Sequence, residues 1–337
     1  MNNEHIRLGH GAGGVLTKKL VEQVFQKHLT DRELRKLEDS AILPREKGAL
    51  AFTTDSYVVS PLFFPGGDIG KLSITGTIND LVVMSARPVY ISAGFIIEEG
   101  LPLKTVERVV KSMSRTAKIG GVRIVTADTK VVEHGKGDGL FITTSGIGIL
   151  QGEKLERKRI KPGDTLIVTG TMGDHGATIL LSRKRDELKF ETRIKSDCAP
   201  LNGMLLPLFK EFGSDIHWAR DITRGGLFTI LNEAVAETGY EIRVREREIP
   251  VDPEVKSVCE VLGLDPFYLA NEGKVLLSVD PGVAESVVRV LRRHPYGRNA
   301  SIIGSVSRGT GQVYLETTTG GLRIADSLLD DPVPRIC

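Results

Sequence analysis

Aspartates recur at the ends of apolar segments in this chain, and carboxylates placed in that way could bind a divalent cation. They are Asp39, Asp55, Asp80, Asp128 and Asp221. Each alone has a simpler explanation, since Asp80 and Asp221 precede apolar helical runs as N-caps do, and Asp55 and Asp128 could end strands in turns. Together they would suit magnesium, which takes hard oxygen ligands and often shares them with substrate phosphates. The pattern indicates a nucleotide triphosphate enzyme without a P-loop.

Two glycine-rich stretches were compared with known phosphate-binding patterns. Gly9 to Gly14 matches G-x-G-x-x-G and precedes a helix whose first amides could hold an anion. A Rossmann site is not expected, because the segment before it is short and polar and Asp31 to Asp39 is charged rather than a second strand. Gly66 to Leu72 approaches a Walker A loop, but Leu72 replaces the residue that would contact magnesium. We expect a phosphate-binding turn at the first stretch and an ordinary loop at the second.

The three cysteines, Cys198, Cys259 and Cys337, show neither a disulfide framework nor zinc-ligand spacing. Cys198 and Cys259 lie in apolar, helical-looking surroundings, which favours buried thiols. Cys337 ends a tail whose prolines favour extended backbone. Ten extended residues span at most ~35 Å, so this thiol could travel between an internal site and a partner.

Composition sets the class of protein. The chain has 337 residues, 45 Lys+Arg, 43 Asp+Glu and 40% hydrophobic residues, as expected of a soluble globular protein with two domains. The sequence has no dense block of basic residues, so a nucleic-acid partner is not expected. No apolar stretch approaches the ~20 residues that span a bilayer, and the polar start at Met1 to Arg7 favours a cytoplasmic protein without a membrane partner.

Hydrophobic periodicity predicts an α+β fold. Apolar residues at helical spacing predict a helix over 105–119, and further helices are expected over 15–28, 176–187, 201–212, 226–237 and 283–293. Short β-branched runs predict strands near residues 50, 122, 140, 165, 275, 302 and 313, the last two as an antiparallel pair. Because helices and strands do not alternate strictly, we expect mixed or antiparallel sheets. The predicted domains are 1–150 and 151–322, followed by a flexible tail over 323–337.

The motifs together resemble the family of AIR synthase (PurM), selenophosphate synthetase and thiamine-monophosphate kinase, and within it the hydrogenase-maturation members, over essentially the whole chain. The motifs are His10 to Gly14, Thr53 to Asp55, Asn79 to Leu81, Ala127 to Lys130, Gly173 to Gly176, Asp221 to Gly226, Asn271 to Gly273 and Pro334 to Cys337. This chain departs from the pattern at Glu38, which precedes Asp39 where relatives often have two aspartates.

The resemblance implies an AIR synthase-like fold and a specific activity. A carbamoyltransferase, HypF, would load a carbamoyl group onto Cys337, and this protein would dehydrate that S-carboxamide with ATP and Mg²⁺ to a thiocyanate. The cyanide would pass to an iron-carrying HypC–HypD complex for [NiFe]-hydrogenase, and a homodimer is implied as well.

The resemblance also assigns residues to roles. Asp39, Asp55, Asp80, Asp128 and Asp221 would hold metal, the last three also contacting ATP with Gly11, Gly13, Gly14 and Asn79. Glu272 would be the base, and Lys130 an orienting cation or proton relay. His175 and His217 could equally be structural.

Thiamine-monophosphate kinase and a noncatalytic scaffold remain as alternatives, whereas selenophosphate synthetase is disfavoured. Thiamine-monophosphate kinase shares the aspartates but gives no purpose to a tail ending in cysteine. Selenophosphate synthetase needs a reactive cysteine near its N-terminus, whereas the first cysteine here is Cys198. A noncatalytic scaffold would use the tail only to dock onto a partner.

Overall fold

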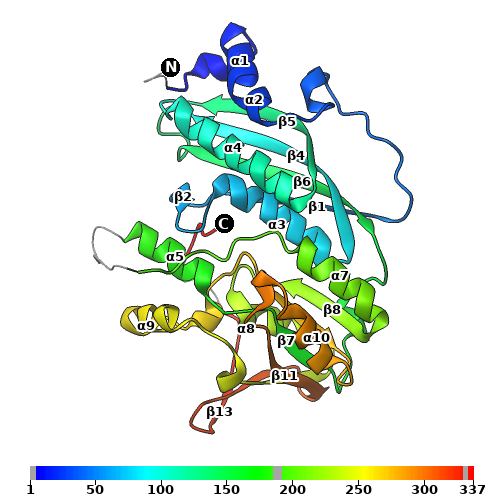
Figure 1. Cartoon of the computed structure of the whole chain (residues 1–337). Helices are drawn as coiled ribbons and strands as arrows, with labels where there is room; N and C mark the ends of the chain where they lie inside the picture. The colour runs from blue at the N-terminus through cyan, green and yellow to red at the C-terminus, as the bar shows by residue number, and fades with distance from the viewer. Residues whose placement is uncertain (1–4, 185–191, 329–332) are drawn as a thin grey trace.

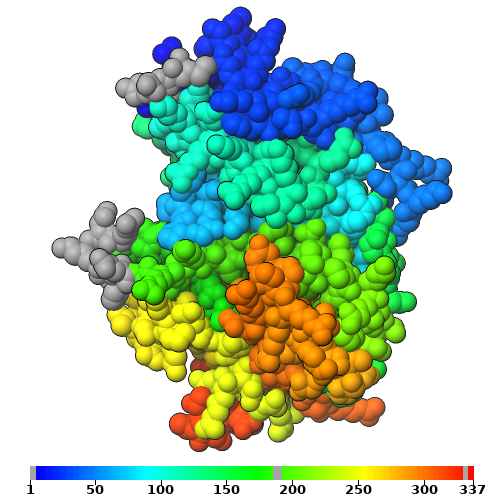
Figure 2. All heavy atoms as spheres, viewed as in Figure 1, coloured from blue at the N-terminus to red at the C-terminus, as the bar shows by residue number. Residues whose placement is uncertain are grey.

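The computed structural model describes residues 5–184, 192–328 and 333–337, and these form two halves that are each built on one principal sheet. Figure 1 shows the N-terminal half, coloured blue to cyan, above the C-terminal half, coloured green to orange. Figure 2 shows the two halves packed directly against each other. The predicted α+β class with mixed sheets is confirmed. Among the described residues, no helix is long and apolar enough to cross a membrane.

The N-terminal half is a four-stranded sheet with helices across one face. Its strands lie in the order β1 (Leu50–Tyr57), β6 (Leu140–Leu150), β4 (Ala86–Glu98) and β5 (Arg123–Val132). β4 and β5 run parallel, while β1 with β6 and β6 with β4 run antiparallel. The smaller elements are η1 (Leu8–Gly11), α1 (Val15–Leu20), η2 (Val21–Phe25), α2 (Gln26–His28), η3 (Leu34–Lys36), β2 (Phe63–Phe64) and β3 (Gly67–Asp68).

Helix α3 (Ile69–Val83) lies at the centre of the molecule. It packs on the sheet, on α4 (Leu103–Gly120) and on elements of the C-terminal half. Because it is enclosed on all sides, nearly all of its residues are buried, as expected for a helix that is apolar around its circumference. Its N-cap is Asp68, whose side chain accepts a hydrogen bond from the Lys71 amide.

The C-terminal half is a seven-stranded sheet with helices packed on it (Figure 1). Its strands lie in the order β13 (Leu322–Ile324), β12 (Val313–Glu316), β9 (Tyr240–Arg245), β11 (Ser301–Arg308), β7 (Thr165–Val168), β10 (Val275–Val279) and β8 (Ile216–Asp221). Its helices are η4 (Arg157–Arg159), α5 (Asp174–Arg183), α7 (Asn202–Phe212), η5 (Gly213–Asp215), α8 (Gly226–Val235), η6 (Glu246–Glu248), α9 (Pro253–Leu262), η7 (Pro266–Tyr268), α10 (Ala284–Leu291) and η8 (Pro295–Gly297).

The predicted antiparallel pairing of the strands near 302 and 313 is wrong. β9 lies between them and pairs with β11 antiparallel and with β12 parallel. Strand β9 was missed, although buried Ile242 and Val244 alternate with exposed Arg243 and Arg245 as in a half-buried strand. A short connection between two strands therefore did not make them neighbours.

Several local predictions also differ from the structure. Gly66 to Leu72 is not a loop, because after the turn at Gly66 it forms the short strand β3 and the first residues of α3. Asp80 lies inside α3, and Asp221 ends β8 five residues before α8 begins, so neither is an N-cap. The predicted helix over 176–187 corresponds to α5, and its residues beyond 184 lie outside the described part of the chain.

Candidate active site

Four carboxylates from both halves meet where α3 contacts β1 and β8, and we call them the seam cluster. They are Asp55 of β1, Asp80 of α3, Asp221 at the end of β8 and Glu272 in the loop before β10. The Thr53 hydroxyl donates a hydrogen bond of 2.7 Å to Asp80 Oδ2. Asp221 pairs in register with Val275, which brings the end of β8 to the Glu272 loop. Three of the predicted metal aspartates and the predicted base are therefore neighbours.

Burial and nearby carboxylates raise the pKa values of three members of the seam cluster, Asp80, Asp221 and Glu272. Burial, then the charge of Asp221, raises the pKa of Asp80 to about 7. Burial also raises the pKa of Asp221, against the opposing effect of Arg220. The pKa of Glu272 lies well above its ordinary range because of burial and the nearby carboxylates. The cluster consequently holds protons near neutral pH.

One oxygen of the Glu272 side chain has no hydrogen-bond partner among the described residues, but the Glu272 backbone is held firmly. Asp197 accepts hydrogen bonds from the Glu272 amide at 3.0 Å and the Gly273 amide at 3.1 Å. A Cβ on Gly273 would lie 2.1 Å from the Asp197 carbonyl, so only glycine fits there. Within the described residues, Glu272 Oε1 is buried without a hydrogen-bond partner. A buried polar atom of this kind points to a group that binds there.

Asn79 joins the two halves. Its amide nitrogen donates to the carbonyls of Ala199 and Glu272, and its oxygen accepts from the Leu201 amide at 2.9 Å. These bonds satisfy most of its hydrogen-bonding capacity and fix α3 against the Glu272 loop. Its predicted contact with ATP stays a prediction.

A second group of predicted residues lies at the opposite edge of the N-terminal sheet. Asp128 and Lys130 are on β5 and pair at 2.8 Å, which lowers the pKa of Asp128. The glycine-rich stretch packs beside them, since a Cβ on Gly11 would lie 2.6 Å from the Val131 amide. Following the register across four strands places this edge roughly 14 Å from Asp55. The structure therefore divides the predicted ATP residues into two groups.

Asp39 is exposed in the loop after η3, away from regular structure. In the described residues, no three His, Cys, Asp or Glu side chains are arranged closely enough to form a ready metal cage. Magnesium is usually bound through one or two carboxylates with water and phosphate completing its shell, so such a cage is not required.

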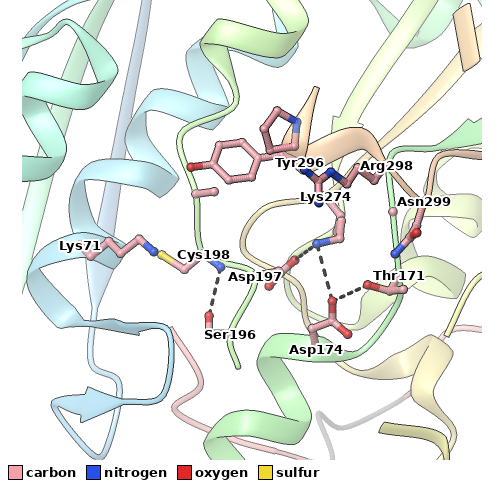
Figure 3. A pocket seen from close by; sticks show the side chains of 13 residues that line it. Lys71, Thr171, Asp174, Ser196, Asp197, Cys198, Lys274, Tyr296, Arg298 and Asn299 are labelled. Carbon is pink, nitrogen blue, oxygen red and sulfur yellow. Dashed lines mark hydrogen bonds and ion pairs between the residues drawn. The ribbon is translucent and has the colours of Figure 1, made fainter. Parts of the chain in front are cut away.

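A cavity of about 300 Å³ adjoins the Glu272 loop and contains charged residues that sequence reasoning missed (Figure 3). Lys274 Nζ lies 3.1 Å from Asp197 Oδ2 and 3.7 Å from Asp174 Oδ2. Burial and the Asp197 charge raise the pKa of Asp174 to about 7. Against the effect of its own burial, Lys274 and the Glu272 amide keep the pKa of Asp197 low. The only sequence signal was the motif that contains Asp174, because Asp197 and Lys274 meet only in the fold.

The tail is docked rather than extended away from the protein. The Val58 amide donates to a terminal carboxylate oxygen of Cys337 at 2.9 Å, so the last residue lies at the end of β1, the strand that carries Asp55. Val333 and Ile336 are 1% and 2% exposed and join the hydrophobic core. The prediction of a flexible tail did not include this packing. Cys198 and Cys259 are buried, as expected.

Comparison with protein families places both halves in one class. The AIR synthase related protein N-terminal domain matches residues 37–150, and the corresponding C-terminal domain matches residues 161–316. The chain is thus an AIR synthase-related protein.

Comparisons with individual proteins narrow the class. The carbamoyl dehydratase HypE of Azotobacter vinelandii is 44% identical over all of this chain and 98% of its own length. A solved structure of the hydrogenase maturation protein HypE in complex with ATP is 45% identical, covers 98% of this chain and 99% of its own, and superposes with a TM-score of 0.93. HypE in a HypE–HypF complex superposes with a TM-score of 0.80 at 45% identity, over 92% and 99% of the two chains. The chain therefore belongs to the HypE family of carbamoyl dehydratases.

We predict that Asp80→Asn stabilises the protein at high pH. The pKa of Asp80 is raised from 3.8 to about 7 on folding, so its favourable contribution is complete below pH ~4 and is lost as pH rises through ~7. In urea unfolding with EDTA present, the variant should gain on the order of 1–3 kcal/mol over wild type at pH 8, relative to the difference at pH 4. Asp215→Asn, at an exposed carboxylate outside the cluster, should show no such trend. Equal pH dependence for Asp80→Asn and wild type would contradict the burial argument.

Proposed function

We propose that the protein dehydrates a carbamoyl group carried on Cys337 to a thiocyanate, with ATP as the dehydrating reagent, and so supplies cyanide for [NiFe]-hydrogenase iron. Membership in the HypE family carries this proposal, and the docking of Cys337 on the strand that bears Asp55 supports it. A cytoplasmic location is proposed with it.

The chemistry explains why ATP is needed. An amide oxygen is a poor leaving group, so it attacks the γ-phosphorus of ATP and becomes a phosphate ester while ADP leaves. Loss of the amide protons and departure of the oxygen as phosphate then leave a carbon–nitrogen triple bond on the sulfur. In phosphoryl transfer the protein mainly positions groups and compensates charge. Side chains that orient the carboxamide, accept protons and hold anionic phosphates are therefore what the site must provide.

The seam cluster suits a divalent cation that carries phosphates. Its carboxylates offer hard oxygen atoms, and Glu272 Oε1 is left unpaired there within the described residues. Bound Mg²⁺ would supply charge stabilisation for the phosphates. We assign Asp55, Asp80 and Asp221 to that cation. Asp128, with the glycine-rich turn and Asn79, is proposed for the nucleotide.

Glu272 is proposed as the base that removes the amide proton. Burial and the charge of Asp197 raise the pKa of Glu272, and the charges of Asp221, Asp55 and Asp80 raise it further, so that Glu272 is protonated near neutral pH. When those charges are compensated, part of the cause of the raised pKa disappears, and Glu272 can accept a proton. Its protonation would then depend on whether the nucleotide site is loaded. Lys130, held by Asp128, is proposed as an orienting cation.

Two partners and a dimer complete the proposal. A HypF carbamoyltransferase would load Cys337, as the HypE–HypF complex of a relative suggests, and a HypC–HypD complex would accept the cyanide. The homodimer would form through the open face of the N-terminal sheet, where Leu50 and Phe52 are 63% and 69% exposed. Thiamine-monophosphate kinase activity and a noncatalytic scaffold are less supported, because neither gives a role to Cys337 beside β1.

Cys337 should carry the product. After incubation with the carbamoyl donor system, the peptide ending at Cys337 should gain a carboxamide, and ATP should then remove the mass of one water. Cys259→Ala, which removes a buried thiol, should behave as wild type. Turnover by Cys337→Ala would refute the assignment, and mass spectrometry of that peptide decides it.

Asp221→Asn should weaken ATP binding only when magnesium is present. The change keeps the side-chain shape but removes a charge that a cation needs, so we expect a loss of at least ~10-fold in affinity for Mg-ATP. Affinity for ATP in EDTA should be unchanged. An equal loss in both conditions, measured by calorimetry, would argue for a structural effect instead.

Phe52→Glu should convert the dimer to a monomer. It places a charge on an exposed apolar sheet face, where pairing with a second copy would bury it. Ile119→Glu, at a residue of α4 that is 62% exposed, is the matched control and should leave the mass unchanged. Light scattering after gel filtration gives the mass. If Phe52→Glu remains a dimer, the interface does not lie on this face of the sheet.

A further inference from the structure

The tail is bound through its backbone, with a hydrogen-bond donor at a main-chain oxygen of each of its last four residues. Arg183 donates to the carbonyls of Pro334, at 2.6 Å, and of Arg335. His175 Nε2 lies 2.8 Å from the Ile336 carbonyl, and the Val58 amide donates to a terminal carboxylate oxygen of Cys337. Hydrogen bonds to main-chain oxygens constrain the course of the backbone whatever its side chains are. They therefore fix where the final residue lies.

Two of these donors come from opposite ends of α5. His175 is in its first turn and Arg183 is its last residue, and the tail runs beside this helix toward α3 (Figure 1). Arg183 Nε also donates to the Ser60 carbonyl at 2.7 Å. One guanidinium therefore ties the tail to the segment that follows β1.

The orientation of His175 is set by Ser196. The ring is completely buried, and burial lowers its pKa, so it is neutral. Because Nε2 faces a carbonyl, which only accepts, Nε2 carries the proton and Nδ1 accepts from the Ser196 hydroxyl at 2.7 Å. Ser196 precedes Asp197, which holds the Glu272 amide. We call His175 and Arg183, which donate to the tail carbonyls, the tail clamp. The adjacent residues Ser196 and Asp197 thus orient one member of this clamp and the proposed base Glu272.

The tail adopts a conformation that needs such restraint. Arg335 has a φ of 56°, in the left-handed region that non-glycine residues rarely occupy. Its side chain donates to the Val58 carbonyl and pairs with Asp138. A strained residue persists where its surroundings hold it in place, and here the tail contacts do so.

We propose that His175 and Arg183 are positioning residues that hold the tail carbonyls, so that Cys337 stays in register with the site at the end of β1 during dehydration. This rests on the proposed function. Neither residue touches the reacting atoms. Their effect is on where the sulfur lies, and release of these bonds would free the tail without disturbing the seam cluster.

Paired substitutions separate positioning from structure. In His175→Asn the amide reaches only the Nδ1 position, so the bond to Ser196 survives while the Ile336 carbonyl loses its donor. In His175→Gln the amide nitrogen reaches the Nε2 position and should rescue the clamp. Arg183→Gln shortens a partly exposed side chain and tests the other clamp with little risk to folding.

The first readout is iodoacetamide alkylation of Cys337 in the unmodified full-length protein, measured relative to buried Cys198 and Cys259. Loss of one such hydrogen bond should speed Cys337 alkylation about 5-fold in His175→Asn, and loss of the two bonds from Arg183 should speed it at least as much in Arg183→Gln. His175→Gln should stay within about 2-fold of wild type. General destabilisation would instead expose all three thiols. Unchanged Cys337 reactivity in Arg183→Gln and in any folded His175→Asn would overturn the proposal.

The second readout is single-turnover dehydration of the carbamoylated protein, alongside ATP affinity. Positioning predicts slower dehydration in the two clamp variants at wild-type ATP affinity. Equal dehydration rates in wild type and both variants would also overturn it. If wild type itself loses no water, the proposed function fails, while the alkylation result still decides whether the clamp exists.

Discussion

The crowding of four carboxylates between the two halves, with Asp221 and Glu272 buried and Asp55 and Asp80 half-buried, is the constraint on which the rest of this structure depends. Asp55, Asp80, Asp221 and Glu272 repel one another in a region of low polarity, and Arg220 partly offsets the effect at Asp221. A cluster of this kind is costly unless it takes up protons or a cation. Packing of the central helix α3 against strands of both sheets offsets this unfavourable free energy and holds the two halves together.

The segment from Ser196 to Cys198 connects the surroundings of this cluster. The Ser196 amide donates a hydrogen bond to the Pro65 carbonyl, and the Ser196 hydroxyl orients His175 toward the tail. Asp197 holds the Glu272 amide and pairs with Lys274 (Figure 3). One short stretch therefore supports both the proposed base and the proposed carrier of the substrate. A small shift there would move both, which is why a preorganised support matters for catalysis.

Sequence reasoning found the residues that occur in recognisable motifs and missed those defined by contact. Periodicity located α4 and seven of the strands, because each forms from its own residues, but it did not predict the central helix α3 or the strands β4 and β8. It missed the place of β9 between β11 and β12, since strand order depends on non-local pairing. Glu272 was found from its motif, but Asp197 and Lys274 were not, because their pairing spans 77 positions. The division of the aspartates between two edges of a sheet likewise required the register.

The most direct test of the account is the number of protons released when Mg-ATP binds. Isothermal titration calorimetry at pH 7 in buffers of different ionisation enthalpy gives this number. If the seam cluster holds protons that a loaded site expels, wild type should release roughly one proton, and Asp80→Asn measurably less. A binding enthalpy that is independent of the buffer, or identical release by wild type and Asp80→Asn, would contradict the account.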